Sequence, residues 1–552
     1  MTRRTRLIVV GAGLVVLVAA VGAAAIVVGS PGSGTIGPPH FVDETAQAGI
    51  SHTYGGDETY QTGGGVAVFD CDTDGRPDVY LAGGGSPAAL YRNESPTGGA
   101  LRFVPLHDPA TDLDGVTGAY PLDVDGDGIV DLAVLRVGES VLLRGLGGCR
   151  FERANEAWGV APARALTTAF SATWEAGAVA PTLAFGNYMG LDDTGEPTSR
   201  CVDNEVFRPG ASATTYGPPI PLAPGYCPLS MLFSDWDGSG RRDLRISNDR
   251  HYYDNEVGQE QLWRFEPDQP PRLYTEADGW ALVRIWGMGI ASYDVTGDGL
   301  PEVYLTSQGA NRLQTLIDGP GKPTFGELAL ERHVEATRPV VGGDPLPSTA
   351  WHPEFQDVNN DGLMDLFVSK GNVGEVPDYA AKDPSNLFLG RPDGMYAEAS
   401  EAAGIVSFDR GRGAALADFN QDGLLDLVEV FLGAPVRVWR NVGAGTIDAP
   451  APMGNWLAVR LGQPGGNRDA IGAIIERKVG DTVTRRETSV GGGHIGGQLG
   501  WTHLGLGAAT EAQVRVTWPD GEAGPWMTIA ANQFVDIERG AAGPTPWTPR
   551  GG

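Results

Sequence analysis

Aspartates recur in this chain at a spacing that suits the binding of a hard cation. In the stretch AVFDCDTDGRPDVYL, the acids at offsets 0, 2, 4 and 8 are Asp70, Asp72, Asp74 and Asp78. Gly75, at offset 5, can adopt the backbone conformation that a sharp reversal needs. Calcium takes about six to eight oxygen ligands, so side chains converging from this turn, with a backbone carbonyl near offset 6, would form its coordination shell.

The same pattern occurs six times. A single Asp-Gly turn is often only a good hairpin turn, but six copies with equal offsets favour metal binding. The positions that are not acidic carry Asn, Thr or Ser, which still offer an oxygen atom. Magnesium keeps several of its waters and suits so dense a cluster poorly, so we predict about six calcium sites. The ligands predicted in the five later loops are Asp123, Asp125, Asp127 and Asp131; Asp235, Asp237, Ser239 and Asp243; Asp294, Thr296, Asp298 and Glu302; Asp357, Asn359, Asp361 and Asp365; and Asp418, Asn420, Asp422 and Asp426.

Short strands are expected to hold these loops. The first loop lies between two apolar runs, Val66 to Phe69 and Val79 to Leu81, which indicates a strand–loop–strand hairpin. Most repeats contain two further candidate strands, one like LYRN at Leu90 to Asn93 and one around an aromatic residue such as Phe103. Four strands per repeat predict the blade of a β-propeller, and therefore an all-β fold.

The spacing of the loops predicts seven blades over residues 40–445. Successive first aspartates are 53, 112, 59, 63 and 61 residues apart, so the gap of 112 should contain an additional repeat. Within it, Thr168 to Tyr188 keeps the apolar flanks of a loop but has lost the acids. We also expect Phe41 to Thr45 to pair into the last blade and close the ring, because closure removes two exposed sheet edges.

The repeats and the closing segment resemble known families. The loops and blades are similar to the FG-GAP/VCBS repeats of integrin α-chains and related bacterial proteins. Residues 452–540 resemble the ASPIC/UnbV domain, a small β-rich unit, and a disordered tail is expected at 541–552. Together they resemble the cartilage acidic protein 1 family, which implies a secreted or surface propeller that binds calcium and has no established enzymatic activity. The motifs of the closing segment are GNWLAVRL (Gly454 to Leu461), NRDAIGA (Asn467 to Ala473), THLGLG (Thr502 to Gly507) and VRVTWPDG (Val514 to Gly521).

The N-terminal segment predicts a membrane anchor. Three arginines among the first six residues precede an uncharged run from Leu7 to Gly29. As a helix rising about 1.5 Å per residue, this run would span about 35 Å, enough to cross a bilayer. The arginines would stay in the cytoplasm, so residues 1–29 predict a single-pass signal anchor, with a Gly/Pro/Ser linker at 30–39 and the bulk of the chain outside the cell. The alternative is a cleaved signal peptide, with its usual apolar region of about 7–15 residues, and a secreted protein.

Composition and motifs limit the classes of function. The net charge of −29 excludes nucleic acid as a partner, because phosphate binding needs a basic face. The chain has no nucleophile elbow, phosphate loop or HExxH motif, so an enzyme is less favoured. We therefore expect a calcium-dependent extracellular binding or scaffold protein without catalysis, whose partner is an unidentified extracellular protein or glycan. The alternative is a cell-surface enzyme that acts on a polysaccharide or another extracellular polymer at the propeller face.

The cysteines allow two kinds of pairing outside the cell. Cys201 and Cys227 bracket a proline-rich excursion, and a disulfide closing it is the favoured pairing. Pairing across blades with Cys71 or Cys149 is the alternative. Cys71 stands at offset 1 of a loop, where its side chain should point away from a metal ion.

A few aromatic and histidine residues have two interpretations. Trp286, Trp351 and His352 each precede or enter a loop-bearing hairpin, and they either line a ligand funnel on one propeller face or pack between blades, which is more common. His494 and His503 lie in the closing segment without an acidic signature nearby, so packing or surface roles are favoured over a metal site.

Overall fold

The computed structural model describes residues 36–210, 215–249 and 258–549, and all of these belong to one compact unit. The fold of this part of the chain is all-β, as predicted, with helical segments of only three or four residues. These are η1 (Glu58–Tyr60), α1 (Asn155–Trp158), η2 (Glu276–Asp278) and α2 (Ser400–Ala403).

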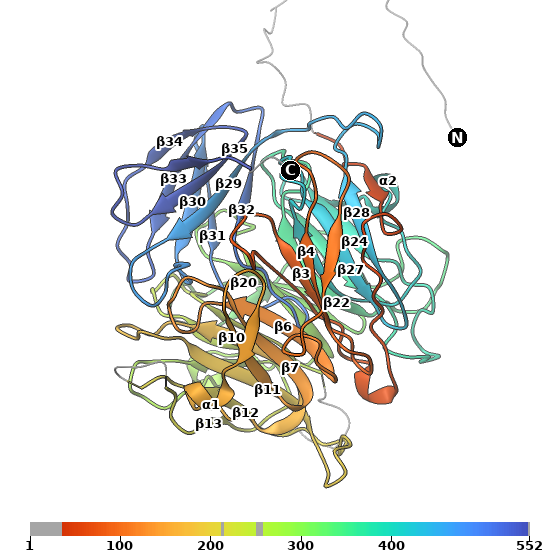
Figure 1. Ribbon diagram of the computed structural model, residues 1–552, viewed down its shortest axis with the longest axis vertical. Helices are drawn as coiled ribbons and strands as arrows, with labels where there is room; N and C mark the ends of the chain where they lie inside the picture. The colour runs from red at the N-terminus through yellow and green to blue at the C-terminus, as the bar shows by residue number, and fades with distance from the viewer. Residues whose placement is uncertain (1–35, 211–214, 250–257, 550–552) are drawn as a thin grey trace, which may run out of the picture. The chain divides into compact units, whose positions relative to one another are not determined.

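Seven four-stranded units, or blades, follow one another along the chain (Figure 1). Each blade is antiparallel and is written here from its innermost strand outward. Blades 1 to 3 comprise β2 (Val66–Phe69), β3 (Asp78–Leu81), β4 (Ala89–Asn93) and β5 (Phe103–Leu106); β6 (Val116–Leu122), β7 (Asp131–Glu139), β8 (Val141–Gly145) and β9 (Phe151–Arg153); and β10 (Arg164–Thr173), β11 (Thr182–Gly190), β12 (Asn204–Phe207) and β13 (Ile220–Leu222).

The later blades repeat this order. Blades 4 to 6 comprise β14 (Pro228–Ser234), β15 (Asp243–Asn248), β16 (Gln261–Arg264) and β17 (Arg272–Leu273); β18 (Gly287–Tyr293), β19 (Glu302–Ser307), β20 (Arg312–Leu316) and β21 (Phe325–Glu327); and β22 (Ala350–Gln356), β23 (Asp365–Lys370), β24 (Asn386–Gly390) and β25 (Tyr396–Glu398). Blade 7 comprises β26 (Gly411–Ala417), β27 (Asp426–Phe431), β28 (Ala434–Asn441) and β1 (Phe41–Asp43).

The blades form a closed ring. The innermost strands lie against one another in chain order, and β2 contacts both β6 and β26. As the sequence predicts, the N-terminal strand β1 pairs with β28, with Phe41 opposite Asn441, so the last blade takes its outermost strand from the other end of the ring. Blades 2 and 3 are continuous because the end of β7 also pairs with the start of β10. Closure of this kind protects sheet edges that would otherwise pair with other chains.

The C-terminal unit consists of two further four-stranded sheets, drawn in blue in Figure 1. Their inner faces share a core that includes Leu457, Val514 and Val535. The sheets comprise β29 (Asn455–Gly462), β32 (Thr502–Gly507), β35 (Gln533–Glu538) and β36 (Thr545–Trp547) in one, and β30 (Ile474–Val479), β31 (Thr482–Glu487), β33 (Glu511–Thr517) and β34 (Met527–Ala530) in the other.

The tail after residue 540 is ordered as far as residue 549, which corrects the prediction of disorder at 541–552 for these residues. Strand β36 pairs with β35, and Trp547 lies 5.1 Å from Trp501 between ring centroids. A strand this short carries little periodic signal, so its order depends on tryptophan packing that the sequence does not reveal.

A glycine-rich segment of the C-terminal unit, residues 490–499, fills the middle of the ring, and we call it the plug. It forms bridges with the innermost strands of five blades, and a Cβ on Gly496 would lie 2.1 Å from the carbonyl oxygen of Val66. Only glycine permits so close an approach between backbones. The bridges pair Val68 with Gln498, Ala119 with Gly496, Ala172 with Val490, Leu232 with Gly491 and Ile290 with Gly493.

The plug also shows what Trp351 and His352 contact, a point on which the sequence allowed two interpretations. His494 is fully buried, with its ring centroid 4.9 Å from that of Trp351 in blade 6. Its backbone N–H donates to His352 Nδ1 at 3.1 Å. Burial lowers the pKa of His494 well below its usual value. Trp351 and His352 therefore contact the plug, and His352 also lines the cavity described below.

Two disulfides are present. Cys201–Cys227 closes the proline-rich excursion, which confirms the favoured pairing. Cys71–Cys149 joins the first loop of blade 1 to the chain that enters β9 of blade 2.

The prediction of an N-terminal transmembrane helix is corrected. Across residues 36–210, 215–249 and 258–549, no helix has the length and apolar character needed to span a membrane. The segment from Leu7 to Gly29, on which the prediction fell, lies outside the described residues. The single-pass anchoring of the chain is withdrawn with it, because hydrophobic length in a sequence does not establish a spanning helix.

Candidate metal centres

The six acidic loops, named here by their blades as loops 1, 2, 4, 5, 6 and 7, share one backbone conformation. In each, the first aspartate accepts a hydrogen bond from the N–H of the glycine at offset 5, at 2.8 to 3.0 Å. That glycine has a φ between 82° and 93° in every loop. The left-handed conformation explains why glycine stands at this offset, since other residues resist it. The glycines are Gly75, Gly128, Gly240, Gly299, Gly362 and Gly423.

The acid at offset 8 begins the second strand of its blade and ties the loop to the third strand. Asp426 accepts hydrogen bonds from the N–H of Phe419 at 3.1 Å and of Asn441 at 2.9 Å. Loops 1, 2 and 6 repeat both bonds with Asp78, Asp131 and Asp365. These carboxylates are buried, and they fix the loop against the body of the blade.

Predicted ligands converge in loops 1 and 2. In loop 1, carboxylate oxygens of Asp70, Asp72 and Asp78 lie within 4.8 Å of one another. In loop 2, the same holds for Asp123, Asp125 and Asp127. Clusters of oxygen ligands alone suit a hard cation better than a thiolate- or imidazole-seeking metal.

Burial without a counter-ion gives these acids unusual pKa values. Burial, with a smaller contribution from repulsion by Asp125 and Asp123, raises the pKa of Asp131 to about 8 against the hydrogen bonds that lower it. The pKa of Asp123 rises to about 6 for the same reasons. In loops 1 and 7, burial raises the pKa of Asp78 and Asp426 well above the ordinary value. A bound cation would favour the ionised forms.

Two predicted ligands have buried oxygens that accept no hydrogen bond from the described residues. These atoms are Oδ1 of Asn420 in loop 7 and Oδ1 of Asp235 in loop 4. A buried acceptor without a donor is costly, and a metal ion would satisfy it. The donor set therefore fits a hard cation in more loops than the two where carboxylates converge most closely.

The loops differ in whether an arginine side chain contacts their acids. In loop 4, Arg241 Nε lies 2.9 Å from Asp243 Oδ1, and the indole of Trp236 donates to the other oxygen at 2.8 Å. In loop 2, Arg144 Nε lies 2.8 Å from Asp125 Oδ2. No guanidinium of the described residues lies within 4.0 Å of a carboxylate of loops 6 and 7. In loop 6, however, Arg477 Nη2 donates to the carbonyl oxygen of Gly362 at 2.9 Å, so loop 7 is the most open to a metal ion.

The corresponding loop of blade 3 has lost every acidic ligand, as the sequence predicts. Counting back from Thr182, which begins β11, offsets 0, 2 and 4 are occupied by Trp174, Ala176 and Ala178. Glu175 instead accepts a hydrogen bond from Thr182 Oγ1 at 2.6 Å and forms an ion pair of 2.6 Å with Arg208, which follows the third strand.

All six acidic loops touch the C-terminal unit, which the sequence did not predict because each contact joins residues far apart in the chain. In loop 6, for example, the N–H of Gly507 donates to the carbonyl oxygen of Asn360 at 2.8 Å. The other contacts are Trp501 Nε1 to Gly75 O at 3.0 Å, Arg468 Nε to Gly126 O, Asp235 N to Glu487 Oε2 at 3.0 Å, Arg485 Nη1 to Asp294 Oδ2 at 3.9 Å, and the ring of Trp456 against Gly423.

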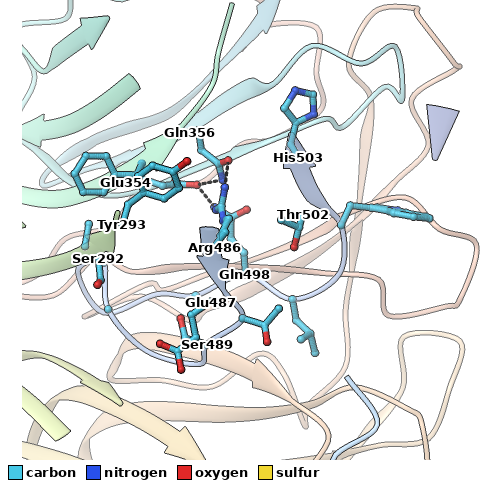
Figure 2. Close-up of a pocket in the computed structure, with 18 of the residues that line it drawn as sticks. Ser292, Tyr293, Glu354, Gln356, Arg486, Glu487, Ser489, Gln498, Thr502 and His503 are labelled. Carbon is cyan, nitrogen blue, oxygen red and sulfur yellow. Dashed lines mark hydrogen bonds between the residues drawn. The ribbon is translucent and has the colours of Figure 1, made fainter. Parts of the chain in front are cut away.

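A cavity of about 300 Å³ lies where these loops, the inner strands and the C-terminal unit meet. The first aspartates of four loops line it, and Figure 2 shows the polar side chains of its wall. These aspartates are Asp70, Asp235, Asp294 and Asp418.

Two family models match the chain. The model described as FG-GAP-like repeat matches residues 70–134, 294–368 and 357–429. The model described as ASPIC and UnbV matches residues 463–544. The FG-GAP-like matches include five of the six acidic loops, all except loop 4. The ASPIC and UnbV match includes most of the C-terminal unit.

Curated relatives share part of the chain. Cartilage acidic protein 1 of Homo sapiens is 27% identical over 249 residues, which cover 43% of this chain and 33% of that protein. The Xenopus tropicalis protein of the same name is 25% identical over 281 residues, covering 49% and 39%. The chain thus spans little more than a third of the length of these relatives.

Solved structures match at lower similarity. A Trichoderma reesei carbohydrate-active enzyme of family AA12, in its calcium structure, is 8% identical, with a TM-score of 0.34 over 74% of this chain and 99% of that chain. An Agrocybe aegerita lectin that recognises non-reducing terminal N-acetylglucosamine is 16% identical, with a TM-score of 0.29 over 68% and 80%.

Proposed function

The chain belongs to the FG-GAP-like repeat proteins that carry a C-terminal ASPIC and UnbV domain, and we propose that it is a calcium-dependent binding protein. In this proposal, calcium ions in the six loops stiffen the blades and hold the face on which the C-terminal unit docks. The observation that carries the proposal is the repeated loop with buried oxygens that lack a donor, such as Asn420 Oδ1.

Charge supports calcium as the ion. Of the 24 predicted ligands, 20 are carboxylates, and six divalent ions would reduce the formal charge from −29 to −17. Without metal, burial and, to a smaller extent, mutual repulsion raise the pKa values of Asp123 and Asp131, and a bound cation would counter both effects. Folded protein binds the ions and unfolded chain does not, so calcium should stabilise the fold by mass action.

Because the loops contact the C-terminal unit, calcium in the loops should also affect how that unit docks on the propeller. Backbone groups of the loops, among them the carbonyl oxygens of Gly75 and Asn360, are the partners of that unit. A loop that relaxes without its ion would misplace them. We therefore propose that calcium controls docking of the C-terminal unit as well as rigidity of the blades.

The two disulfides favour an oxidising compartment, consistent with work outside the cell on a protein or glycan partner. The alternative, a surface enzyme acting on a polymer, has less support, because the plug occupies the middle of the ring where a central active site would lie.

Thermal unfolding of the full chain tests the proposal. Calcium at about 10 mM should stabilise each occupied site by about 1.4 to 2.7 kcal/mol if the dissociation constants are about 0.1 to 1 mM. Several such sites should raise the Tm above that in chelator by more than about 10 °C. Magnesium at the same concentration is the control and should shift the Tm much less. An equal Tm in calcium and in chelator would refute the proposal.

A further inference from the structure

The cavity between the propeller and the C-terminal unit has walls from both. Ser292, Tyr293, Glu354 and Gln356 come from the innermost strands of blades 5 and 6, and Arg486 comes from β31 of the C-terminal unit (Figure 2). The plug adds Gln498. The volume of the cavity, about 300 Å³, is at the lower end of the range for small-ligand sites. Because both parts supply walls, the cavity exists only while the C-terminal unit is docked.

Arg486 brings a charge into this cavity without an acid to pair with it. A guanidinium has about five N–H donors, and among the described residues only Gln356 Oε1, 2.8 Å from Arg486 Nη1, accepts from one of them. No carboxylate oxygen lies within 4.0 Å of the guanidinium in the part of the chain that the structure describes. Burial lowers its pKa, but arginine remains charged at neutral pH.

Glu354, an acid of the cavity wall beside Gln356, already accepts hydrogen bonds from other groups. Glu354 accepts hydrogen bonds from Gln356 Nε2 and from Gln498 Nε2, both at 2.8 Å. It also accepts from the N–H of Leu416 at 3.1 Å. Gln356 therefore stands between Glu354 and Arg486, with its oxygen toward the guanidinium and its nitrogen toward the carboxylate. The remaining donors of Arg486 are left for a ligand.

Hydroxyl groups surround the same space. Ser292, Ser489 and Thr502 line the cavity, and within the described residues their side chains take part in no hydrogen bond. A planar guanidinium with unused N–H groups matches a carboxylate, which it can bind through two parallel hydrogen bonds. Free hydroxyls match the hydroxyls of a sugar.

We propose that the cavity binds a small hydroxylated carboxylate of the size of one uronic acid residue. The carboxylate would bind to Arg486, and the ring hydroxyls would bind to Ser292, Ser489 and Thr502. Four loop aspartates also line the cavity and would repel an anion unless their loops hold cations. The inference therefore rests on the proposed calcium function, and it predicts that the ligand binds only in calcium.

Isothermal titration calorimetry of the calcium-loaded full chain tests the inference with D-glucuronate and D-galacturonate as probes and D-glucose as the neutral match. At least one uronate should bind, and glucose should bind at least about tenfold more weakly because it lacks the charge-assisted bonds. Arg486→Gln should weaken uronate binding by at least about tenfold. Arg391→Gln, at an exposed arginine paired with Asp393 outside the cavity, is the matched control and should leave binding unchanged.

A second variant guards against misfolding of the first. Thr502→Val keeps the shape of the side chain but removes a hydroxyl, so it should weaken uronate binding several-fold at an unchanged Tm. Absence of uronate binding, equal affinity for glucose, or full binding by Arg486→Gln would each overturn the inference. If calcium raises the Tm but no uronate binds, this inference fails and the proposed function stands; if calcium has no effect on the Tm, the proposed function fails.

Discussion

Blades 3 and 7 carry loops of the same length between their first two strands, yet they stabilise them in different ways. In blade 7 the positions at offsets 0, 2, 4 and 8 are Asp418, Asn420, Asp422 and Asp426. In blade 3 the same offsets hold no acid, and Glu175 pairs with Arg208. The acid of the blade 3 loop is thus paired with an arginine from the end of the third strand, whereas the acids of the blade 7 loop have no such partner among the described residues.

A third arrangement occurs within blade 7 itself. Glu429 on β27 is fully buried, and its carboxyl accepts from the hydroxyls of Ser369 and Ser385, each at 2.6 Å. Burial raises the pKa of Glu429 to about 7, so the protonated form is more favoured there than for an ordinary glutamate. Buried acids in this fold are thus matched in three ways: by an arginine, by hydroxyl donors together with a raised pKa or, in the six loops, by the ion that we propose.

The largest effect is expected from Asp426→Ala in calcium. The change removes the acceptor of two buried N–H groups, those of Phe419 and Asn441, and a proposed metal ligand. Urea unfolding should show a loss of about 4 kcal/mol, because each buried donor left without a partner costs about 1–3 kcal/mol. The matched change in blade 3, Thr182→Ala, should cost about 1 kcal/mol. Equal losses in the two blades would remove the distinction between them.

The next effect concerns pH. The folded pKa of Glu429, about 7, is above its unfolded value of 4.5, so the neutral acid favours folding below pH 4.5. This stability is lost as pH rises from 4.5 to about 7. In calcium, Glu429→Gln should therefore be nearly neutral at pH 5 and stabilising by about 2–3 kcal/mol at pH 8. Urea unfolding at the two pH values measures this, and an equal effect at both would contradict the raised pKa of Glu429.

A smaller effect is expected from Glu175→Gln in blade 3. The change breaks the pair with Arg208, whose side chain is only partly exposed, and should cost about 1–2 kcal/mol. Since no ion is involved, the loss should be the same in calcium and in chelator when unfolding is followed in each. A loss that appears only in calcium would mean that blade 3 also depends on the metal.

The smallest effect is expected in loop 4. Arg241 competes with a metal ion for Asp243, so Arg241→Gln should raise the calcium affinity of that loop a few-fold. Calcium titration of the variant beside the unchanged chain measures this. A lower affinity would show that the arginine helps to shape the site instead of occupying it.

Local features of the sequence were enough to predict much of this architecture. Equal offsets identified the six loops, the double gap located blade 3, and an unpaired aromatic segment identified β1 as the closing strand. These signals are short-range and repeated, so they can be compared with one another. Two cysteines that bracket one loop likewise pointed to the pair Cys201–Cys227.

Long-range contacts were not predictable in the same way. The plug consists of glycines around His494 and has the composition of a flexible loop, and its conformation depends on bridges to five separate blades. The docking of the C-terminal unit on the loops and the order of β36 depend on tryptophans whose partners lie far away in the chain, such as Trp501 with Gly75. Arg486 could not be singled out either, because its missing acid partner is a property of the cavity.

Counting bound ions shows whether the six loops hold calcium and blade 3 does not. The full chain is dialysed to equilibrium in about 10 mM calcium, well above dissociation constants of about 0.1 to 1 mM, and the metal is quantified by mass spectrometry against protein concentration. Six ions per chain are expected, one fewer after the double change Asp418→Ala and Asp422→Ala, and no change after Glu175→Gln. Fewer than half that number in the unchanged chain, or a loss of an ion on changing blade 3, would contradict the proposed calcium sites.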